Sequence, residues 1–338
     1  MKKRAVFLIL LILFLIGSVY AQRGTARGET INIRFGSVLP RNSDFGRTLD
    51  RMASEWERAT NGAVRVTVSH DGREGTEQNM ISAISSNSIQ AGLFSAAGIS
   101  EICPAIITMS TPFMIRTDNE LDLILREVEP ILHSRVRNDF VVVAWAKGGW
   151  LYLFSKEPIL TPADLRRQRL ASNPELRDMN LAFRTMGFTL ADADMSNMGP
   201  RLASNAINAI YMAPTAVAPL QLHRHLNHML NIPIAPVMGA LVMNRVTWDR
   251  LTSEQQQAIV RVTQRMVVEF NESIPRSETA AITAMERGGL SVNRPSPAQE
   301  ALWRTELDNS INSLVGPVFD REIYQIANRI LERTRSGR

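Results

Sequence analysis

The chain has 338 residues, 45% of them hydrophobic, and a formal net charge of +5, which is enough material for two lobes with buried cores. Its 38 Lys and Arg residues are scattered without a long block of like charge, so a nucleic-acid partner is not indicated. Cys103 is the only cysteine, which excludes an intrachain disulfide. Its apolar neighbours are typical of a small buried side chain rather than a nucleophile.

The N-terminus has the layout of a secretory signal peptide over residues 1–21. Residues 1–4 (MKKR) are basic, residues 5–16 are an unbroken apolar run, and residues 19–21 (VYA) end on a small side chain. The run is short for a membrane span. We therefore expect cleavage after Ala21 and a periplasmic location, without lipid attachment because no cysteine directly follows the run. An uncleaved N-terminal anchor is the alternative.

The next part of the chain alternates predicted strands and helices. Ile31, Ile33 and Phe35 alternate with polar residues, which predicts a strand. Helical spacing follows over residues 49–59 and ends at Gly62, as glycine commonly ends a helix. Residues 64–68 alternate again and complete a βαβ unit. Further along, the patterns predict a helix over 77–86, a strand over 89–94, a helix over 121–129 and a buried strand over 140–145.

The pattern restarts after Gly148 and Gly149. It predicts strands over 150–154 and 235–244, a helix over 179–186, and helices over 253–286, 298–310 and 321–334. Pro275 falls inside the longest helix and predicts a kink there. Alternating β and α elements favour an α/β fold of two doubly wound lobes.

Catalytic and metal-binding motifs are absent from the sequence, and we expect no enzyme activity, cofactor or metal. The densest candidate is the group His223, His225 and His228, but only the last two would share a face of a helix. No flanking carboxylate is available to orient a ring. A solvated helical face is the simpler interpretation. Asp178, Asp192 and Asp194 are interpreted as capping and loop residues.

Five stretches stand in an order and spacing that point to one family. They are residues 56–62 (WERATNG), 75–77 (GTE), 111–114 (TPFM), 156–165 (KEPILTPADL) and 202–208 (LASNAIN). Together they resemble the DctP-like substrate-binding component of tripartite ATP-independent periplasmic (TRAP) transporters, over about residues 31–306. The resemblance implies a periplasmic binding protein-like clamshell, in which two α/β lobes joined by crossing strands and a long helix hold a ligand between them. We expect residues 28–148 plus 238–276 in lobe I, and 149–237 plus 277–338 in lobe II with the C-terminal helices.

The departures from the family pattern concern the ligand anchors. Carboxylate-binding members carry an Arg shortly after the Pro-x-Asp-Leu element, where this chain has Ala171, and a second Arg after the hinge glycine, where it has Leu151. A family aromatic becomes Met195, and a polar Asn or Gln becomes Met212. These replacements predict an apolar cleft.

We therefore expect a ligand that is apolar or lacks a carboxylate. The predicted ligand-binding residues are Ser37, Phe94, Ser95, Trp150, Leu151, Ala171, Met195, Asn197, Met212 and Met238. A carboxylate binder with a relocated anchor, Arg41, Arg73 or Arg201, is the alternative for the ligand.

The resemblance implies capture of a small molecule and its delivery to TRAP membrane subunits driven by an ion gradient. Some relatives also work beside a periplasmic tetratricopeptide-repeat protein, and such a partner is possible here. A ligand-responsive sensor or adaptor with the same clamshell is a different function that the sequence leaves open. A periplasmic hydrolase would need a nucleophile with an oriented base, and we find none.

Overall fold

The computed structural model describes residues 30–174, 176–195 and 197–337. The predicted signal peptide, residues 1–21, lies outside the described residues. Within these ranges, no helix has both the length and the apolar character needed to cross a membrane.

The first lobe is built on three parallel strands with helices around them. Its elements are β1 (Ile31–Gly36), α2 (Asp44–Ala59), β2 (Val64–Ser69), α3 (Glu77–Ser85), β3 (Ala91–Ser95), α4 (Ala96–Ser100), η1 (Pro104–Ser110) and α5 (Asp118–Arg135). β1 pairs with β2 and with β3, both in parallel. Trp56 of α2 is fully buried, lies edge-on to Phe35, and donates its indole N–H to Thr263 at 3.0 Å.

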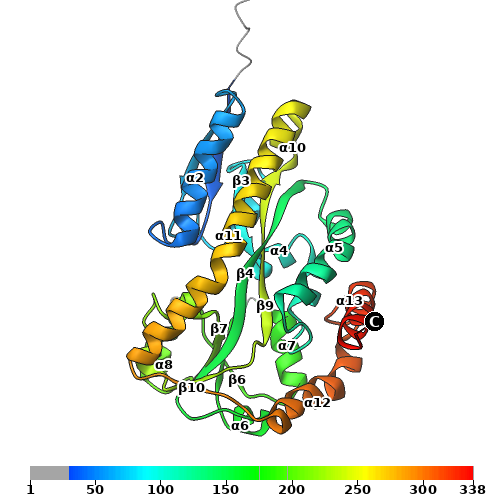
Figure 1. Cartoon of the computed structure of the whole chain (residues 1–338). Coiled ribbons are helices and arrows are strands. Elements are labelled where there is room, and N and C mark those ends of the chain that lie inside the picture. Colours follow the sequence, from blue (N-terminus) through cyan, green and yellow to red (C-terminus); the bar gives the residue numbers. More distant parts are fainter. Residues whose placement is uncertain (1–29, 175, 196, 338) are drawn as a thin grey trace, which may run out of the picture.

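Two strands, β4 (Phe140–Ser155) and β9 (Ala235–Asn244), pair in antiparallel and carry the chain between the lobes. Their pairing extends from Phe140 opposite Asn244 to Leu151 opposite Ala235. β4 then continues as far as Ser155 and pairs with β7 and β8 of the second lobe. The sequence predicted separate strands on either side of Gly148 and Gly149. The structure instead has one continuous strand, visible in green through the middle of Figure 1, because β4 pairs with β9 on both sides of the two glycines, up to Lys147 and again from Trp150.

The second lobe adds short elements to the far half of β4. They are α6 (Pro162–Arg166), β5 (Leu170–Ser172), α7 (Arg177–Thr185), β6 (Leu190–Asp192), α8 (Met198–Ala203), β7 (Ala209–Met212), α9 (Pro214–Val217), η2 (Leu222–His225), β8 (His228–Leu230) and β10 (Ser291–Asn293). The sheet runs in the order β2-β1-β3-β9-β4-β7-β5-β6, and β8 joins β4 to β10. The histidines at 223 and 225 thus lie in a 3-10 turn and His228 in a strand, not on one helix.

Long helices connect and cover the lobes. After α10 (Arg245–Asp249), α11 (Ser253–Arg287) contacts α2, β4 and α9, so it spans both lobes, as Figure 1 shows. The helix continues through Pro275. α12 (Pro297–Leu314) packs on α6 and α7, whereas α13 (Arg321–Arg335) packs on α5. The predicted lobe boundaries remain a prediction, and α13 contacts a helix of the group that we assigned to lobe I.

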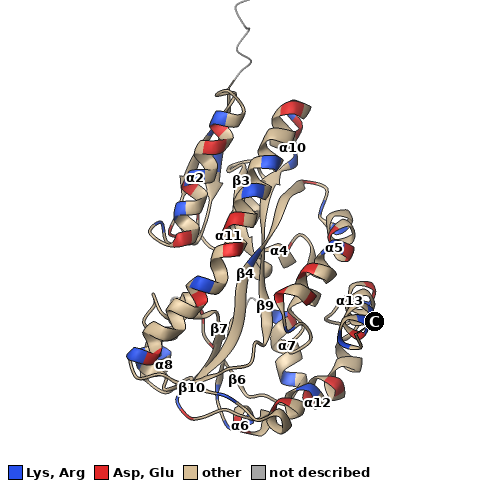
Figure 2. Cartoon of the chain, in the orientation of Figure 1, with Lys and Arg blue, Asp and Glu red and all other residues tan. Residues whose placement is uncertain are grey.

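Charged residues of both signs are spread along the helices, as the colouring of Figure 2 shows. They form pairs across elements, such as Arg265 with Glu55 at 3.2 Å and Arg335 with Glu120 at 2.8 Å. This distribution agrees with the scattered charge of the sequence.

A carboxylate from α11 fixes the point where β4 passes between the lobes. The register of β4 shifts between Lys147 and Trp150, and Gly149 has a φ of +89°. Glu278 is only 8% exposed, and its Oε1 accepts the backbone N–H of Trp150 at 2.7 Å. A Cβ at Gly149 would collide with the same Oε1. Glycine is therefore needed here for both its backbone conformation and the space it leaves.

We expect Gly149→Ala to lower the free energy of unfolding by about 2–4 kcal/mol. A left-handed backbone costs a residue with a side chain about 1–2 kcal/mol, and displacing Glu278 leaves the Trp150 N–H without its buried partner, at about 1–3 kcal/mol. Urea unfolding of the purified protein measures the loss. Gly62→Ala is the matched control, because Gly62 also has a positive φ, +76°, but nothing lies within 4 Å of its added Cβ. Equal losses in the two variants would show that the Glu278 contact is unimportant.

Candidate ligand-binding site

A cavity of about 300 Å³ lies where β4 and β9 meet the ends of the second lobe's strands. Five methionines contribute to its wall: Met179, Met195, Met198, Met212 and Met238. Other apolar wall residues include Leu151, Ile107 and four alanines. Its polar lining residues are Ser95, Ser110, Asn173, Asp194 and Tyr211. The described part of the wall contains no Lys, Arg or His, and Asp194 supplies its one charged side chain.

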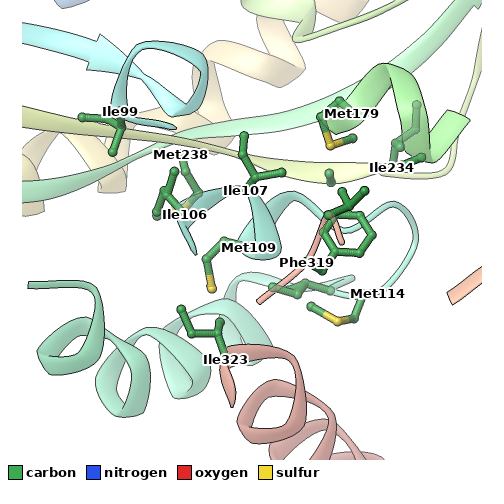
Figure 3. Close-up of a cluster of buried hydrophobic side chains, with 14 of the residues drawn as sticks. Ile99, Ile106, Ile107, Met109, Met114, Met179, Ile234, Met238, Phe319 and Ile323 are labelled. Atoms are coloured by element: carbon green, nitrogen blue, oxygen red, sulfur yellow. The ribbon is translucent and has the colours of Figure 1, made fainter. Parts of the chain in front are cut away.

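The wall is continuous with the main hydrophobic core. Figure 3 shows Ile107 of η1 close to Met238 of β9, with Met179 of α7 facing the same cluster. All three side chains are buried and also line the cavity. The floor of the cavity is therefore held by core packing rather than by a loop.

Six of the ten predicted ligand-binding residues line this cavity. They are Ser95, Leu151, Ala171, Met195, Met212 and Met238. They come from β3, β4, β5, β7, β9 and the turn before α8, so the fold brings together positions that are far apart in sequence. Met195 is 59% exposed and lies at the rim, whereas Ala171 and Met238 are buried. Their contact with a ligand remains a prediction.

The other four predicted residues do not line the cavity. Phe94 and Trp150 are buried in the main core, because alternate residues of a strand point to opposite faces and their neighbours Ser95 and Leu151 take the cavity face. Ser37 is 1% exposed at the end of β1, where its Oγ accepts the backbone N–H of Leu39. Asn197 uses its side-chain oxygen to accept the backbone N–H of Asp194 at 3.1 Å, which shapes the turn before α8.

Several wall residues were not predicted from the sequence. Asn173 and Ala193 directly follow β5 and β6, and the rule that ligands bind beyond the carboxyl ends of strands would have pointed to them. Ile107 and Ser110 belong to η1, whose place against β9 follows from packing alone, so no local signal could have found them.

The two positions that the sequence resemblance matches to anchoring arginines both lie on the wall. Leu151 lies on β4 and Ala171 on β5, so their side chains border the same space from different strands. The alternative anchors lie elsewhere. Arg41 is exposed with its Nε 3.4 Å from Asp50, Arg73 is exposed, and Arg201 of α8 has a buried Nε without a hydrogen-bond partner in the described structure. None of these three arginines is among the described wall residues.

Tyr211 brings a phenol to the wall that stays protonated over the physiological pH range. Burial raises its pKa well above the ordinary value of 10.0. Its ring packs against Phe183 at a centroid separation of 4.9 Å. The phenol is therefore a neutral hydrogen-bonding group on an otherwise largely apolar wall.

Metal coordination finds no support in the described residues. They contain no group of three or more His, Cys, Asp or Glu side chains that could hold an ion. Burial also raises the pKa of the Cys103 thiol to about 11, which keeps it protonated and unreactive.

The model of the bacterial extracellular solute-binding proteins of family 7, DctP, matches residues 35–315. The chain belongs to this family. DctP-family proteins are solute-binding proteins of transport rather than enzymes, and TRAP members bind small molecules in the periplasm and deliver them to TRAP membrane subunits.

Individual DctP-family relatives are distant in sequence but close in fold. The 2,3-diketo-L-gulonate-binding periplasmic protein YiaO of Escherichia coli K12 is 22% identical over 306 residues, which cover 88% of this chain and 89% of YiaO. A TRAP periplasmic solute-binding protein of Chromohalobacter salexigens, solved with bound D-glucuronate, has a TM-score of 0.79 at 16% identity and covers 89% of this chain and 99% of its own. One from Desulfovibrio salexigens, solved with orotic acid, has a TM-score of 0.79 at 16% identity, with 90% and 99% covered. These structures share the two-lobed fold.

The hinge carboxylate of this DctP-family protein gives its stability a pH dependence. Burial raises the pKa of Glu278 above its ordinary value of 4.5; the hydrogen bond from Trp150 lowers the pKa and the negative charge of Asp118 raises it. Between the unfolded and the raised folded pKa, the folded state binds more protons than the unfolded state. The Glu278 contribution to stability is therefore fully present below pH 4.5 and is lost as pH rises through the folded pKa.

We expect Glu278→Gln to remove this loss, since the amide oxygen can still accept the Trp150 N–H without becoming charged. The gain in unfolding free energy over the unmodified protein should grow as pH rises above 4.5 and vanish below it. Thermal unfolding, repeated at intervals of about half a pH unit from about pH 4 to 8, measures this gain. Glu286→Gln, at an exposed position of the same helix, is the control. Parallel curves for the Glu278 variant and the unmodified protein would contradict the assignment.

Proposed function

We propose that this DctP-family protein captures a small molecule with an apolar body and without a carboxylate anchor, and delivers it to TRAP membrane subunits. The observation that supports the ligand class most directly is the pair Leu151 and Ala171. The sequence resemblance matches both positions to arginines of carboxylate-binding relatives, and both residues border the cavity.

The electrostatic argument concerns what a carboxylate would meet in this cavity. A charge-assisted hydrogen bond to a carboxylate contributes about 1.5–3 kcal/mol. Without a cationic partner, taking a carboxylate out of water costs several kcal/mol. The relatives solved with glucuronate and orotic acid hold acids. Because the described wall of this protein has no cation and one carboxylate, Asp194, it favours a different ligand class.

The apolar wall can supply most of the affinity that a transport receptor needs. Burying roughly 300 Å² of apolar ligand surface at ~25 cal/mol/Å² gives ~7 kcal/mol before the costs of association. Micromolar binding corresponds to about 8 kcal/mol, so a few hydrogen bonds from groups such as Tyr211 must add to it. Five methionines suit an irregular ligand, because their side chains are flexible and polarisable.

Capture proceeds by closing the two lobes on the ligand, which shifts the balance between open and closed forms. The closed form then docks on the membrane subunits. Export through a cleaved signal peptide is part of this proposal, whereas a periplasmic tetratricopeptide-repeat partner is an option that the proposal does not require. A sensor using the same clamshell would show the same cavity and would lack the membrane subunits as partners.

We expect the protein purified from its native host compartment to carry an apolar molecule. Native mass spectrometry should show an adduct that organic extraction releases, because an apolar ligand leaves a largely apolar cavity slowly. Protein unfolded and refolded before the measurement is the control and should lack the adduct. A bound carboxylic acid in place of an apolar molecule would contradict the ligand class and leave the family membership standing.

We expect the double substitution Leu151→Arg with Ala171→Arg to create an acid-binding site. D-glucuronate and orotate are the probes, and calorimetry should show binding to the variant at least tenfold tighter than to the unmodified protein, since each new charge-assisted bond adds about 1.5–3 kcal/mol. Leu181→Arg, at an exposed position of α7 that is outside the cavity lining, controls for added charge. Equal acid binding by the unmodified protein would refute the proposal.

A further inference from the structure

Two residues that line the cavity carry a hydroxyl group without a hydrogen bond of its own. They are Ser110, at the end of η1, and Tyr211 of β7. Among the residues that the structure describes, no donor or acceptor pairs with either hydroxyl. The other polar wall residues, Ser95, Asn173 and Asp194, have partners within the protein. The hydroxyls of Ser110 and Tyr211 are therefore the ones that a ligand can engage without breaking an existing bond.

Tyr211 is held in place before a ligand arrives. Its ring packs against Phe183 of α7 with 4.9 Å between the ring centroids, and its strand pairs with β4 at Leu153. The phenol stays protonated at neutral pH, because burial raises its pKa well above 10.0. It therefore has one hydrogen to donate and carries no charge.

Ser110 adds a second neutral hydroxyl from a different part of the fold. It is only 7% exposed, and η1 packs on β9. A buried hydroxyl without a partner costs stability, and a ligand that bonds to it recovers that cost. Ser110 lies among the elements of the first lobe and Tyr211 in the second, so a ligand bonded to both would also connect the lobes.

Two neutral donors on a wall without a cation favour an uncharged oxygen acceptor. A carbonyl oxygen has two lone pairs and accepts from hydroxyl donors without bringing a charge out of water. A carboxylate accepts from the same donors, but it must lose its hydration where the described wall has no Lys, Arg or His. A hydrocarbon leaves both hydroxyls unpaired.

We infer that Ser110 and Tyr211 recognise the polar end of the ligand, and that this end is an uncharged oxygen acceptor, with the carbonyl of a ketone, ester or amide as the best match. The inference rests on the proposed function, because it assigns the polar end of a ligand whose body is apolar. It narrows that ligand class from apolar molecules in general to those that carry a neutral carbonyl.

The test uses three probes with one phenylalkyl body: the ketone benzylacetone, the hydrocarbon butylbenzene and the carboxylate hydrocinnamate. The protein is the full exported chain, residues 22–338, unfolded and refolded to remove any co-purified molecule. Calorimetry at neutral pH should show benzylacetone binding at least about tenfold more tightly than hydrocinnamate, because only the carboxylate has a charge to desolvate. Hydrocinnamate binding as tightly as benzylacetone would overturn the inference.

The double variant Ser110→Ala with Tyr211→Phe then assigns the preference to its residues. It removes both hydroxyls and keeps the ring that packs on Phe183. The affinity for benzylacetone should fall at least about fivefold, whereas butylbenzene, which forms no hydrogen bond, should bind at least as tightly as before. Tyr324→Phe, on α13 and outside the cavity lining, is the matched control and should change neither affinity. Equal losses for benzylacetone and butylbenzene would show a packing role alone and contradict the assignment.

The single variants keep the assignment testable if the double variant loses its fold, which the unfolding temperature reports. Tyr211→Phe or Ser110→Ala should lower the ratio of benzylacetone to butylbenzene affinity at least about threefold. If butylbenzene bound and neither single variant changed this ratio, the inference would fall and the apolar-body proposal would stand. Binding of neither benzylacetone nor butylbenzene would refute the proposed function itself.

Discussion

The pairing of β4 with β9 is the constraint on which the rest of the molecule depends. Sixteen residues of β4 and ten of β9 serve both lobes, so neither lobe has a complete sheet without them. The strands must also change direction between the lobes, and this happens at Gly149. The register shifts there, and it leaves the backbone N–H of Trp150 without a strand partner. Glu278 of α11 accepts that N–H instead. A long strand pair and a long helix are therefore joined at one buried hydrogen bond. Because Leu151 lies two residues beyond Gly149, the bond that fixes the hinge also fixes one wall of the cavity.

The chemistry of the cavity depends on which residues of each strand face it, because successive side chains of a strand point to opposite faces. Trp150 faces the core and Leu151 the cavity; Phe94 faces the core and Ser95 the cavity. Because side chains on the cavity face can vary without altering the fold, the ligand class depends on these wall residues rather than on the fold. The relatives solved with acids share the fold of this chain at 16% identity, so the shared fold does not determine the chemistry of the wall.

Much of the fold could be predicted from the sequence because its elements carry strong local signals. The helix predicted over 253–286 is observed as Ser253–Arg287, since a capping box at Thr252 and the stop at Gly288 are both local. The break predicted at Gly148 and Gly149 was wrong, because pairing with β9 resumes at Trp150 directly beyond the two glycines and carries the strand on despite their weak strand preference. Within the site, Leu151, Ala171 and Met212, which were predicted from their positions in sequence motifs, line the cavity. Ile107 and Ser110 could not be predicted, since only the tertiary packing of η1 on β9 brings them there.

The site combines an apolar wall with a fixed polar support behind it. Leu151 and Ala171 offer no cation to hold an acid, and an apolar wall of this kind would equally admit any neutral apolar molecule. Glu77 supports this wall from behind, because its carboxylate accepts the Ser95 hydroxyl and the backbone N–H groups of Ser95 and Gly98. These three hydrogen bonds fix the end of β3 where it borders the cavity, so the position of Ser95 is set by the fold before any ligand enters.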